Sequence, residues 1–225
     1  MKIEITVKRQ TMPNADSRLQ TFFYNGDGNL TIADWLSEIN QNEVKTDRIA
    51  WECGCMEKKC GACAMRINGI PRLACSTFLK DVAKRGKILL EPLSKFPLVK
   101  DLVVDRSSMF EMLRNMKVWT QEKRQSTYGQ DHDLQYKAGQ CLRCGCCLEV
   151  CPNFLAGGSF GGASAMTEAY KSIEQNERDD HRAEMVTAYR THFFSGCGQS
   201  FSCRDICPMK LPLDEIQARA NGHNH

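Results

Sequence analysis

The sequence lacks the features that mark membrane-spanning and secreted proteins. No apolar run approaches the length needed to cross a bilayer, and the N-terminal residues have no signal-peptide core. A bias of charge is also missing, because 30 basic and 27 acidic side chains leave a formal net charge of only +3. With no Lys/Arg tract dominating any segment, the sequence gives no indication of a nucleic-acid partner.

Cysteine is the residue in excess, with 13 in a chain of 225 residues. The odd number and the missing signal-peptide core disfavour a disulfide framework, so metal or cluster ligands are the better interpretation. Hydrophobic residues make up 42% and charged residues 25%, as in ordinary soluble globular proteins. The length exceeds the common size of one domain, so we expect one large or two small domains.

The first hundred residues predict a small mixed α/β domain. Alternating apolar residues and turn signals predict four short strands, at residues 2–8, 19–24, 64–67 and 87–90. A turn at Asn68-Gly69 separates the last two. Thr31 can cap a helix that follows the first strand pair. The apolar face of that helix would carry Ile32, Trp35, Leu36 and Ile39.

From Asp101 onward the apolar spacing becomes helical. Ser107 or Ser108 can cap a first helix. Its apolar stripe, expected to pack in a core, is Met109, Met112, Leu113 and Met116. Residues 120–139 predict a polar connector, and further helices are expected around residues 168–177 and 182–189. The fold class is therefore α+β, with domains at 1–100 and 101–225.

The first cysteine group is Cys55-x4-Cys60-x2-Cys63, followed by Cys75. This is the plant-type ferredoxin spacing for a [2Fe–2S] cluster, in which a tight loop supplies three thiolates and a later element the fourth. Gly61 would let the backbone approach the sulfurs, where amide N–H groups offset negative charge. A structural zinc site is the alternative, but it usually has two separated Cys-x2-Cys pairs, which the x4 gap fits poorly.

The second group is Cys141-x2-Cys144-x2-Cys147-x3-Cys151-Pro152, the run typical of bacterial ferredoxins. In two-cluster ferredoxins the fourth cysteine of such a run ligates the other cluster. The proline turns the chain away from the site and removes a backbone donor. The run therefore predicts one member of a pair of clusters in this half of the chain.

The third group, Cys197-x5-Cys203-x3-Cys207-Pro208, is the same run with Ser200 where a second cysteine is expected. Exchange of fourth ligands between the two runs predicts two sets of thiols. Cys141, Cys144, Cys147 and Cys207 would hold a [4Fe–4S] cluster, and Cys151, Cys197 and Cys203 a [3Fe–4S] cluster. Ser200 could ligate a fourth iron, but a hydroxyl is a poor ligand beside thiolates, so the three-iron cluster is favoured.

Two cysteines, Cys53 and Cys146, lie outside these assignments, each next to a ligand loop. We expect both to be small buried packing groups, with ligand exchange as the alternative. The terminal residues His223 and His225 could bind stray metal, but a frayed tail is the better prediction.

With these motifs the sequence resembles the iron–sulfur subunit family of succinate dehydrogenase and fumarate reductase over nearly its whole length. The segments that carry the resemblance, besides the two Cys-Pro runs, are Asp27-Gly28-Asn29-Leu30-Thr31, Cys60-Gly61-Ala62-Cys63-Ala64-Met65, Asn68-Gly69-Ile70-Pro71-Arg72-Leu73-Ala74-Cys75, Glu91-Pro92-Leu93 and Lys100-Asp101-Leu102-Val103-Val104-Asp105. The resemblance implies an N-terminal plant-type ferredoxin-like (β-grasp) domain and a C-terminal helical, bacterial-ferredoxin-like domain. Its ligand pattern agrees with the assignments above.

The resemblance also implies a function, electron transfer within an oxidoreductase complex, with no substrate chemistry on this chain. A flavoprotein partner would hold covalent FAD, where succinate and fumarate interconvert. A membrane-anchor subunit of cytochrome b type, often with haem, would bind quinone. Electrons would pass from the flavin through the [2Fe–2S], [4Fe–4S] and [3Fe–4S] clusters to the quinone, on the cytoplasmic side of the cell membrane.

The quinone contacts depart from part of the family pattern. Pro152 matches a position that borders the family's quinone pocket, yet the tryptophan of ubiquinone-linked members is absent from residues 153–156. Gly198 stands where those members have histidine. This glycine and the segment 160–162 resemble the menaquinone-linked members, so menaquinone is the favoured quinone.

Two other hypotheses remain. The same three-cluster wire could serve a soluble or thiol-linked fumarate reductase-type complex with a non-quinone partner. A zinc-stabilised or cluster-sensing regulatory module belongs to another class and predicts a basic nucleic-acid surface, which the near-neutral charge does not support.

Overall fold

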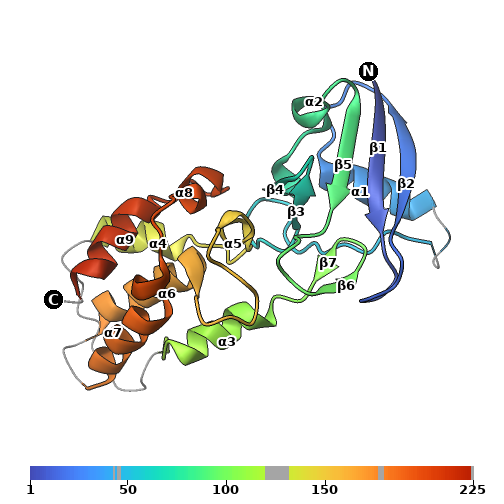
Figure 1. The fold of residues 1–225 in the computed structure, drawn as a ribbon. Coiled ribbons are helices and arrows are strands. Elements are labelled where there is room, and N and C mark those ends of the chain that lie inside the picture. Colours follow the sequence, from blue (N-terminus) through green and yellow to red (C-terminus); the bar gives the residue numbers. More distant parts are fainter. Residues whose placement is uncertain (43, 45–46, 120–131, 177–179, 224–225) are drawn as a thin grey trace. The chain divides into compact units, whose positions relative to one another are not determined.

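The structure, a computed structural model, describes residues 1–42, 44, 47–119, 132–176 and 180–223. The chain divides into two units, each of which can be followed in the ribbon of Figure 1. The first consists of Met1–Asp105 and Leu142–Cys146, and the second of Arg106–Cys141 and Cys147–His225. A short segment from the second half of the sequence therefore belongs with the N-terminal unit.

The N-terminal unit is built on a five-stranded mixed sheet in the order β2-β1-β5-β3-β4. Its strands are β1 (Lys2–Arg9), β2 (Arg18–Asn25), β3 (Ala64–Ile67), β4 (Ile70–Leu73) and β5 (Lys87–Glu91). β1 and β5 are parallel, and the other neighbours are antiparallel. The short helix α2 (Leu79–Val82) precedes β5, and β6 (Leu98–Lys100) and β7 (Val103–Val104) form a separate ribbon.

The four predicted strands are present, and the structure adds β4. Asn68 and Gly69, with φ of +53° and +77°, join β3 to β4 rather than separating β3 from β5. Positive φ at both residues of a two-residue loop is the turn that hairpins favour. Pro71 argues against a strand at residues 70–73 when the sequence is read alone, because proline has no N–H to donate. β4 is an edge strand, however, where such a residue is tolerated.

Helix α1 (Ile32–Asn42) begins after Thr31, as predicted. The Thr31 hydroxyl accepts a hydrogen bond from the Asp34 N–H at 3.1 Å, and the Asp34 carboxylate accepts one from the Thr31 N–H at 3.1 Å. This reciprocal pair resembles a capping box with Asp in place of Glu. Trp35 is buried and meets Phe22 of β2 edge-on, with 5.6 Å between ring centroids. Ile39, expected on the buried face, is half-buried.

A buried ion pair between Arg9 and Asp101 connects β1 to two loops. The side chains are 6% and 2% exposed, and Arg9 Nε lies 3.1 Å from Asp101 Oδ1. The carboxylate also accepts hydrogen bonds from the N–H groups of Gln10 and Ala50, at 3.0 and 2.9 Å. Because the Asp101 carboxylate is paired and hydrogen-bonded, its burial is tolerated. Its hydrogen bond from the Ala50 N–H also fixes the chain just before the first cysteine group.

The second half of the chain is helical where the structure describes it. Its helices are α3 (Ser107–Asn115), α4 (His132–Gly139), α5 (Cys146–Val150), α6 (Gly162–Gln175), α7 (Asp180–His192), α8 (Ser202–Ile206) and α9 (Leu213–Gly222). Across the described residues, no helix combines the length and the apolar character needed to span a membrane.

The predicted helices are present as α3, α6 and α7, with corrections in detail. The serine cap of α3 is wrong, because Ser107 lies inside the helix and the N-cap residue is Arg106, with no side-chain cap. α6 begins well before residue 168, since its first turns are small residues that give no helical period. Part of the predicted connector is the helix α4, and residues 120–131 lie outside the described residues. α9 was not predicted.

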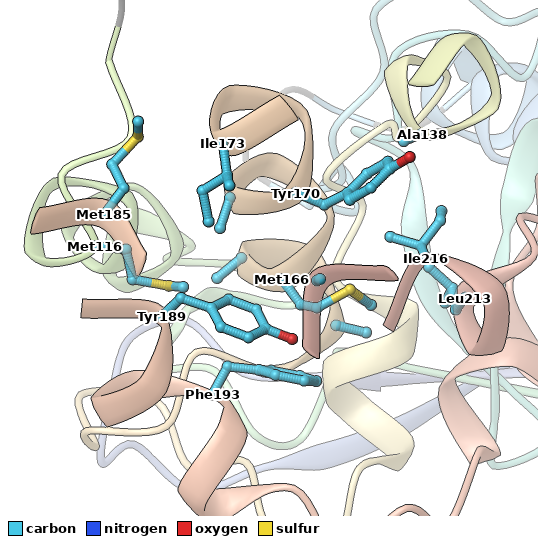
Figure 2. Close-up of a cluster of buried hydrophobic side chains, with 14 of the residues drawn as sticks. Met116, Ala138, Met166, Tyr170, Ile173, Met185, Tyr189, Phe193, Leu213 and Ile216 are labelled. Carbon is cyan, nitrogen blue, oxygen red and sulfur yellow. The ribbon is translucent and has the colours of Figure 1, made fainter. Parts of the chain in front are cut away.

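One hydrophobic core serves the helical unit, and Figure 2 shows part of it. Met112 and Met116 are 7% and 0% exposed, which confirms the core role of the methionine stripe. Tyr189 of α7 packs against Phe193 with 5.3 Å between ring centroids. The partly buried residues that pack against this core include Cys141, Cys147, Cys197, Cys203 and Cys207. The core therefore directly supports cysteines of both ligand runs.

We expect Asp101→Ala to lower the free energy of unfolding by about 3–5 kcal/mol, because the buried Arg9 guanidinium loses its buried partner and keeps only the half-exposed Asp47 carboxylate, at 3.7 Å. The N–H groups of Gln10 and Ala50 also lose their acceptor. Anaerobic denaturant unfolding followed by circular dichroism measures the change. Asp16→Ala is the control, since Asp16 is exposed, and it should change stability by no more than about 0.5 kcal/mol. Equal effects of the two variants would contradict a structural role for the ion pair.

Candidate metal centres

The four cysteines predicted to hold a [2Fe–2S] cluster come together in the N-terminal unit. Sγ of Cys63 lies 3.3 Å from Sγ of Cys75. The Lys58 N–H donates to Cys75 Sγ at 3.3 Å, which ties the ligand loop to the later element. Cys60 lies close enough to Cys55 and Cys63 to influence the pKa of both thiols. The four thiols therefore form one group.

Left-handed backbone curls this ligand loop around its sulfurs. Met56 and Lys58 have φ of +56° and +58°. The N–H groups of Glu57 and Lys59 consequently point inward and donate to Cys55 Sγ at 3.3 and 3.2 Å. Successive N–H groups in such a turn form a concavity that binds anions, here the sulfur of a ligand.

Gly61 also has a role that the sequence did not predict, besides the predicted approach to the sulfurs. Its φ is +76°, and a Cβ at this position would lie 2.7 Å from Leu142 O and 2.9 Å from Cys144 Cβ. Such contacts are closer than side-chain carbons tolerate, so any other residue would displace the segment Leu142–Cys146. Glycine therefore lets a cysteine of the second run pack against the first ligand loop.

The surroundings give these thiols different acidities. The N–H groups of Glu57 and Lys59 lower the pKa of Cys55 from 9.0 to about 7. Burial raises the pKa of Cys63 to about 12. The thiolate is the form that binds metal. Cys55 is thus prepared for ligation at neutral pH, whereas Cys63 would release its proton to water only when a bound metal stabilises its thiolate.

The two surplus cysteines have different environments. Cys146 is 0% exposed, which confirms the predicted packing role. Cys53 is exposed, so the packing prediction is wrong there. The sequence could not separate the two, because the direction of a side chain from a loop depends on the backbone turns around it.

The three cysteines predicted to hold a [3Fe–4S] cluster, Cys151, Cys197 and Cys203, line one cavity in the C-terminal unit. Burial raises the pKa of Cys203, and the negative charges of Cys151 and Cys197 raise it further, so the three sulfurs lie close together. Ser200 lines the same cavity. The structure therefore has a hydroxyl beside three thiols, where the sequence run lacks its cysteine.

The loop that carries Ser200 is tightly turned. Its neighbours Gln199 and Phe201 have φ of +53° and +52°, a left-handed conformation that is strained for residues with side chains. Asn153 Nδ2 donates to the carbonyl oxygen of Gly196, which ties this loop to the end of the second cysteine run. This hydrogen bond anchors the start of the segment that carries Ser200, which is itself exposed.

The cysteines predicted to hold a [4Fe–4S] cluster occur in both units. Cys144 is buried in the N-terminal unit. Cys141, Cys147 and Cys207 pack against the helical core, Cys141 two residues after α4 and Cys207 directly after α8. Their assignment to one cluster rests on the spacing of the two runs.

The donor sets fit iron–sulfur clusters. Each predicted set consists of thiols, the ligands of such clusters, and amide N–H groups donate to two of the sulfurs in the first set. In the part of the chain that the structure describes, no group of three or more Cys, His, Asp or Glu side chains is arranged to hold a single metal ion. The thiols and their N–H donors are the features that match a cluster of iron and sulfide.

The predicted frayed tail is wrong at His223. Its Nε2 lies 2.6 Å from Glu174 Oε1, and its Nδ1 lies 3.2 Å from a guanidinium nitrogen of Arg182. The packing of α9 on α6, which no sequence period revealed, holds this histidine in place. His225 lies outside the described residues.

Comparison with known proteins identifies the family. Residues 4–111 match the family described as a 2Fe-2S iron-sulfur cluster binding domain, and residues 137–211 match the 4Fe-4S dicluster domain. The succinate dehydrogenase iron-sulfur subunit of Bacillus subtilis is 32% identical over 206 residues, which are 86% of this chain and 81% of that protein. This chain belongs to the succinate dehydrogenase/fumarate reductase iron–sulfur subunit family.

Further likenesses agree with this family. The fumarate reductase iron-sulfur subunit of Escherichia coli O157:H7 is 29% identical over 227 residues, which are 96% of this chain and 90% of that protein. A chain of the Mycobacterium smegmatis Sdh1 complex in the apo form has the same fold, with a TM-score of 0.78 at 20% identity, covering 99% of this chain and 96% of that one. The predicted family, fold class and role as an oxidoreductase subunit are confirmed.

In the cluster-free iron–sulfur subunit, alkylation of Cys55 by iodoacetamide should follow a pKa of about 7. A pKa below the ordinary 9.0 means that the thiolate is present above pH 7 and is lost as the pH falls through that value. Cys63, with its pKa raised to about 12, should stay largely unreacted at pH 8. Mass spectrometry of the modified peptides over a pH series measures both rates.

The same measurement in denaturant is the control, because unfolding removes the amide donors and the burial. Both cysteines should then follow the ordinary thiol pKa. A Cys55 profile centred near 9 in the native protein would contradict the effect of the amides.

Proposed function

We propose that this subunit relays electrons between the FAD of a flavoprotein subunit and a quinone bound at a membrane-anchor subunit, as a peripheral protein on the cytoplasmic side of the cell membrane. The names of the relatives, succinate dehydrogenase and fumarate reductase, support succinate and fumarate as the substrate pair of the complex. The domains of the relay would be residues 1–100 and 101–225, and the substrate chemistry belongs to the flavoprotein.

The proposed ligand sets use eleven thiols. They are Cys55, Cys60, Cys63 and Cys75 for a [2Fe–2S] cluster; Cys141, Cys144, Cys147 and Cys207 for a [4Fe–4S] cluster; and Cys151, Cys197 and Cys203 for a [3Fe–4S] cluster. When bound, each cluster supplies a one-electron carrier whose potential depends on its type, its hydrogen bonds and its exposure.

The cavity of Cys151, Cys197 and Cys203 is the observation that carries the proposal. Three thiols and the Ser200 hydroxyl line it, so it offers three good ligands and one poor ligand to a cluster. This favours three irons over four. In the proposed order of electron transfer the [3Fe–4S] cluster is the last of the three. Its presence would therefore support an electron-accepting partner, the quinone, next to this cavity.

The contact between Gly61 and Cys144 supports the order of the first two clusters. A Cβ on Gly61 would lie 2.9 Å from Cys144 Cβ, so a proposed [4Fe–4S] ligand packs against the proposed [2Fe–2S] loop. Electron transfer between carriers slows steeply with distance. Glycine at this position therefore favours direct transfer from the first cluster to the second.

Residues that line the cavity of Cys151, Cys197 and Cys203 support menaquinone as the quinone. Pro152, Asn153, Phe160 and Gly198 line the cavity beside the three thiols. Gly198 is exposed, and a Cβ on it would lie 3.3 Å from Asn153 Nδ2. The histidine of ubiquinone-linked members would therefore shift the end of the Asn153 side chain slightly.

Electron paramagnetic resonance (EPR) with an iron count tests the cluster set. The oxidised, anaerobically purified protein should give a spin-half signal that mild reduction removes, with about nine irons per chain. Ser200→Cys should convert the third centre to four irons, raising the count to about ten and removing the oxidised-state signal. Ser195→Cys is the control outside the cavity lining and should change neither. About ten irons and no oxidised-state signal in the unmodified protein would contradict the three-iron cluster.

Reconstitution tests the relay itself. The isolated subunit should have no succinate dehydrogenase activity, because its thiols bind carriers rather than substrate. With the flavoprotein and the membrane anchor, succinate should reduce menaquinone, and Cys151→Ala should abolish this transfer while succinate still reduces an artificial acceptor at the flavoprotein. Activity of the isolated chain would overturn the proposed function.

A further inference from the structure

A buried glutamine of α9 lines the cavity of the three thiols. Gln217 is 5% exposed, and its Nε2 donates to Cys197 Sγ at 3.5 Å. An N–H···S bond is longer than an N–H···O bond because sulfur is the larger atom, so this distance is that of a hydrogen bond. A buried amide without a partner is destabilising, and the sulfur of Cys197 supplies that partner.

The position of this amide is fixed by the packing of α9. Ile216 and Ala220, on either side of Gln217 in the sequence, are 0% exposed and belong to the helical core. The Tyr189 hydroxyl donates to Asn221 Oδ1 at 2.7 Å, which joins the end of α9 to α7. The side chain of Gln217 therefore points at Cys197 from a rigid element.

We propose that Gln217 sets the reduction potential of the [3Fe–4S] cluster through its hydrogen bond to Cys197. The inference rests on the proposed function, because it takes Cys197 as a ligand. Reduction adds one electron to the cluster, forms and breaks no bond, and increases the negative charge on the ligand sulfurs. An N–H donor stabilises that charge, so it favours the reduced cluster and raises the potential.

Gln217 is a positioning residue, since it touches a ligand and not a substrate. The sulfurs of Cys55 and Cys75 accept hydrogen bonds from backbone N–H groups of the first ligand loop. Cys197 instead receives its N–H from a side chain on a distant helix. A substitution can therefore remove this donor without altering the ligand loop.

The variant that tests the inference is Gln217→Met, which keeps the length of the side chain and removes the donor. EPR-monitored redox titration of the assembled complex should show a lower midpoint potential for the [3Fe–4S] cluster. At the midpoint potential of the unmodified protein, where half of its [3Fe–4S] clusters are reduced, clearly fewer than half of the variant's clusters should be reduced. Gln217→Glu should lower the potential further, because its carboxylate adds negative charge. The [2Fe–2S] signal of the same sample should keep its potential.

Gln135→Met is the matched control, because it makes the same change at another buried glutamine, which lies in α4. Within the described residues its side-chain nitrogen makes no hydrogen bond. This control should leave all cluster potentials unchanged. An equal shift in Gln135→Met and Gln217→Met would show a general effect of core substitution and overturn the inference, as would unchanged potentials in both Gln217 variants.

A measurement on the unmodified protein covers the case in which Gln217→Met loses the cluster. Pulsed EPR of the complex labelled with ¹⁵N-glutamine should detect a glutamine nitrogen coupled to the [3Fe–4S] spin, and the coupling should remain in Gln199→Met, which removes the other glutamine of the cavity. No coupling, or its loss in Gln199→Met, would overturn the inference. Failure of the proposed function is a separate outcome, because the unmodified protein would then have no oxidised-state signal to titrate.

Discussion

Thiolates that share a cluster repel one another, and the rest of this structure holds them together against that repulsion. Sγ of Cys63 and Sγ of Cys75 lie 3.3 Å apart, a separation at which two negative charges disfavour each other strongly. Bound iron offsets this charge, and N–H donors aimed at the sulfurs offset part of what remains. Each ligand loop must therefore bend so that its amides face inward.

Such bends are unfavourable in an isolated peptide. Met56, Lys58, Gln199 and Phe201 all have left-handed backbone, which residues with side chains adopt rarely. The sheet stabilises the first loop, with the Arg9–Asp101 pair fixing the chain before it. The helical core stabilises the second, because Cys197 and Cys203 pack against that core. The stability of the sheet and of the helical core thus offsets the backbone strain in the ligand loops.

The two units supply N–H donors in different ways. The β-grasp unit uses consecutive backbone amides at residues 57–59, which no ordinary substitution removes. The helical unit adds the side chain of Gln217, from a helix far along the sequence. A side-chain donor can be exchanged without changing the ligand loop. The potential of the proposed [3Fe–4S] cluster would therefore be open to change by single residues, while that of the [2Fe–2S] cluster would depend on the fold.

The sequence by itself determined the family and the fold class, predicted the cluster ligands, and located many of the helices and strands. Ligand spacing and strand alternation are local signals, so the cysteine runs, the four predicted strands and the Thr31 cap could be read directly. Tertiary structure decided the features that depend on distant contacts. These are the edge position that admits β4, the burial of Cys146 but not Cys53, the approach of Cys144 to Gly61, and the placing of Gln217 at Cys197. No local pattern encodes them, because each arises when segments far apart in the chain pack together.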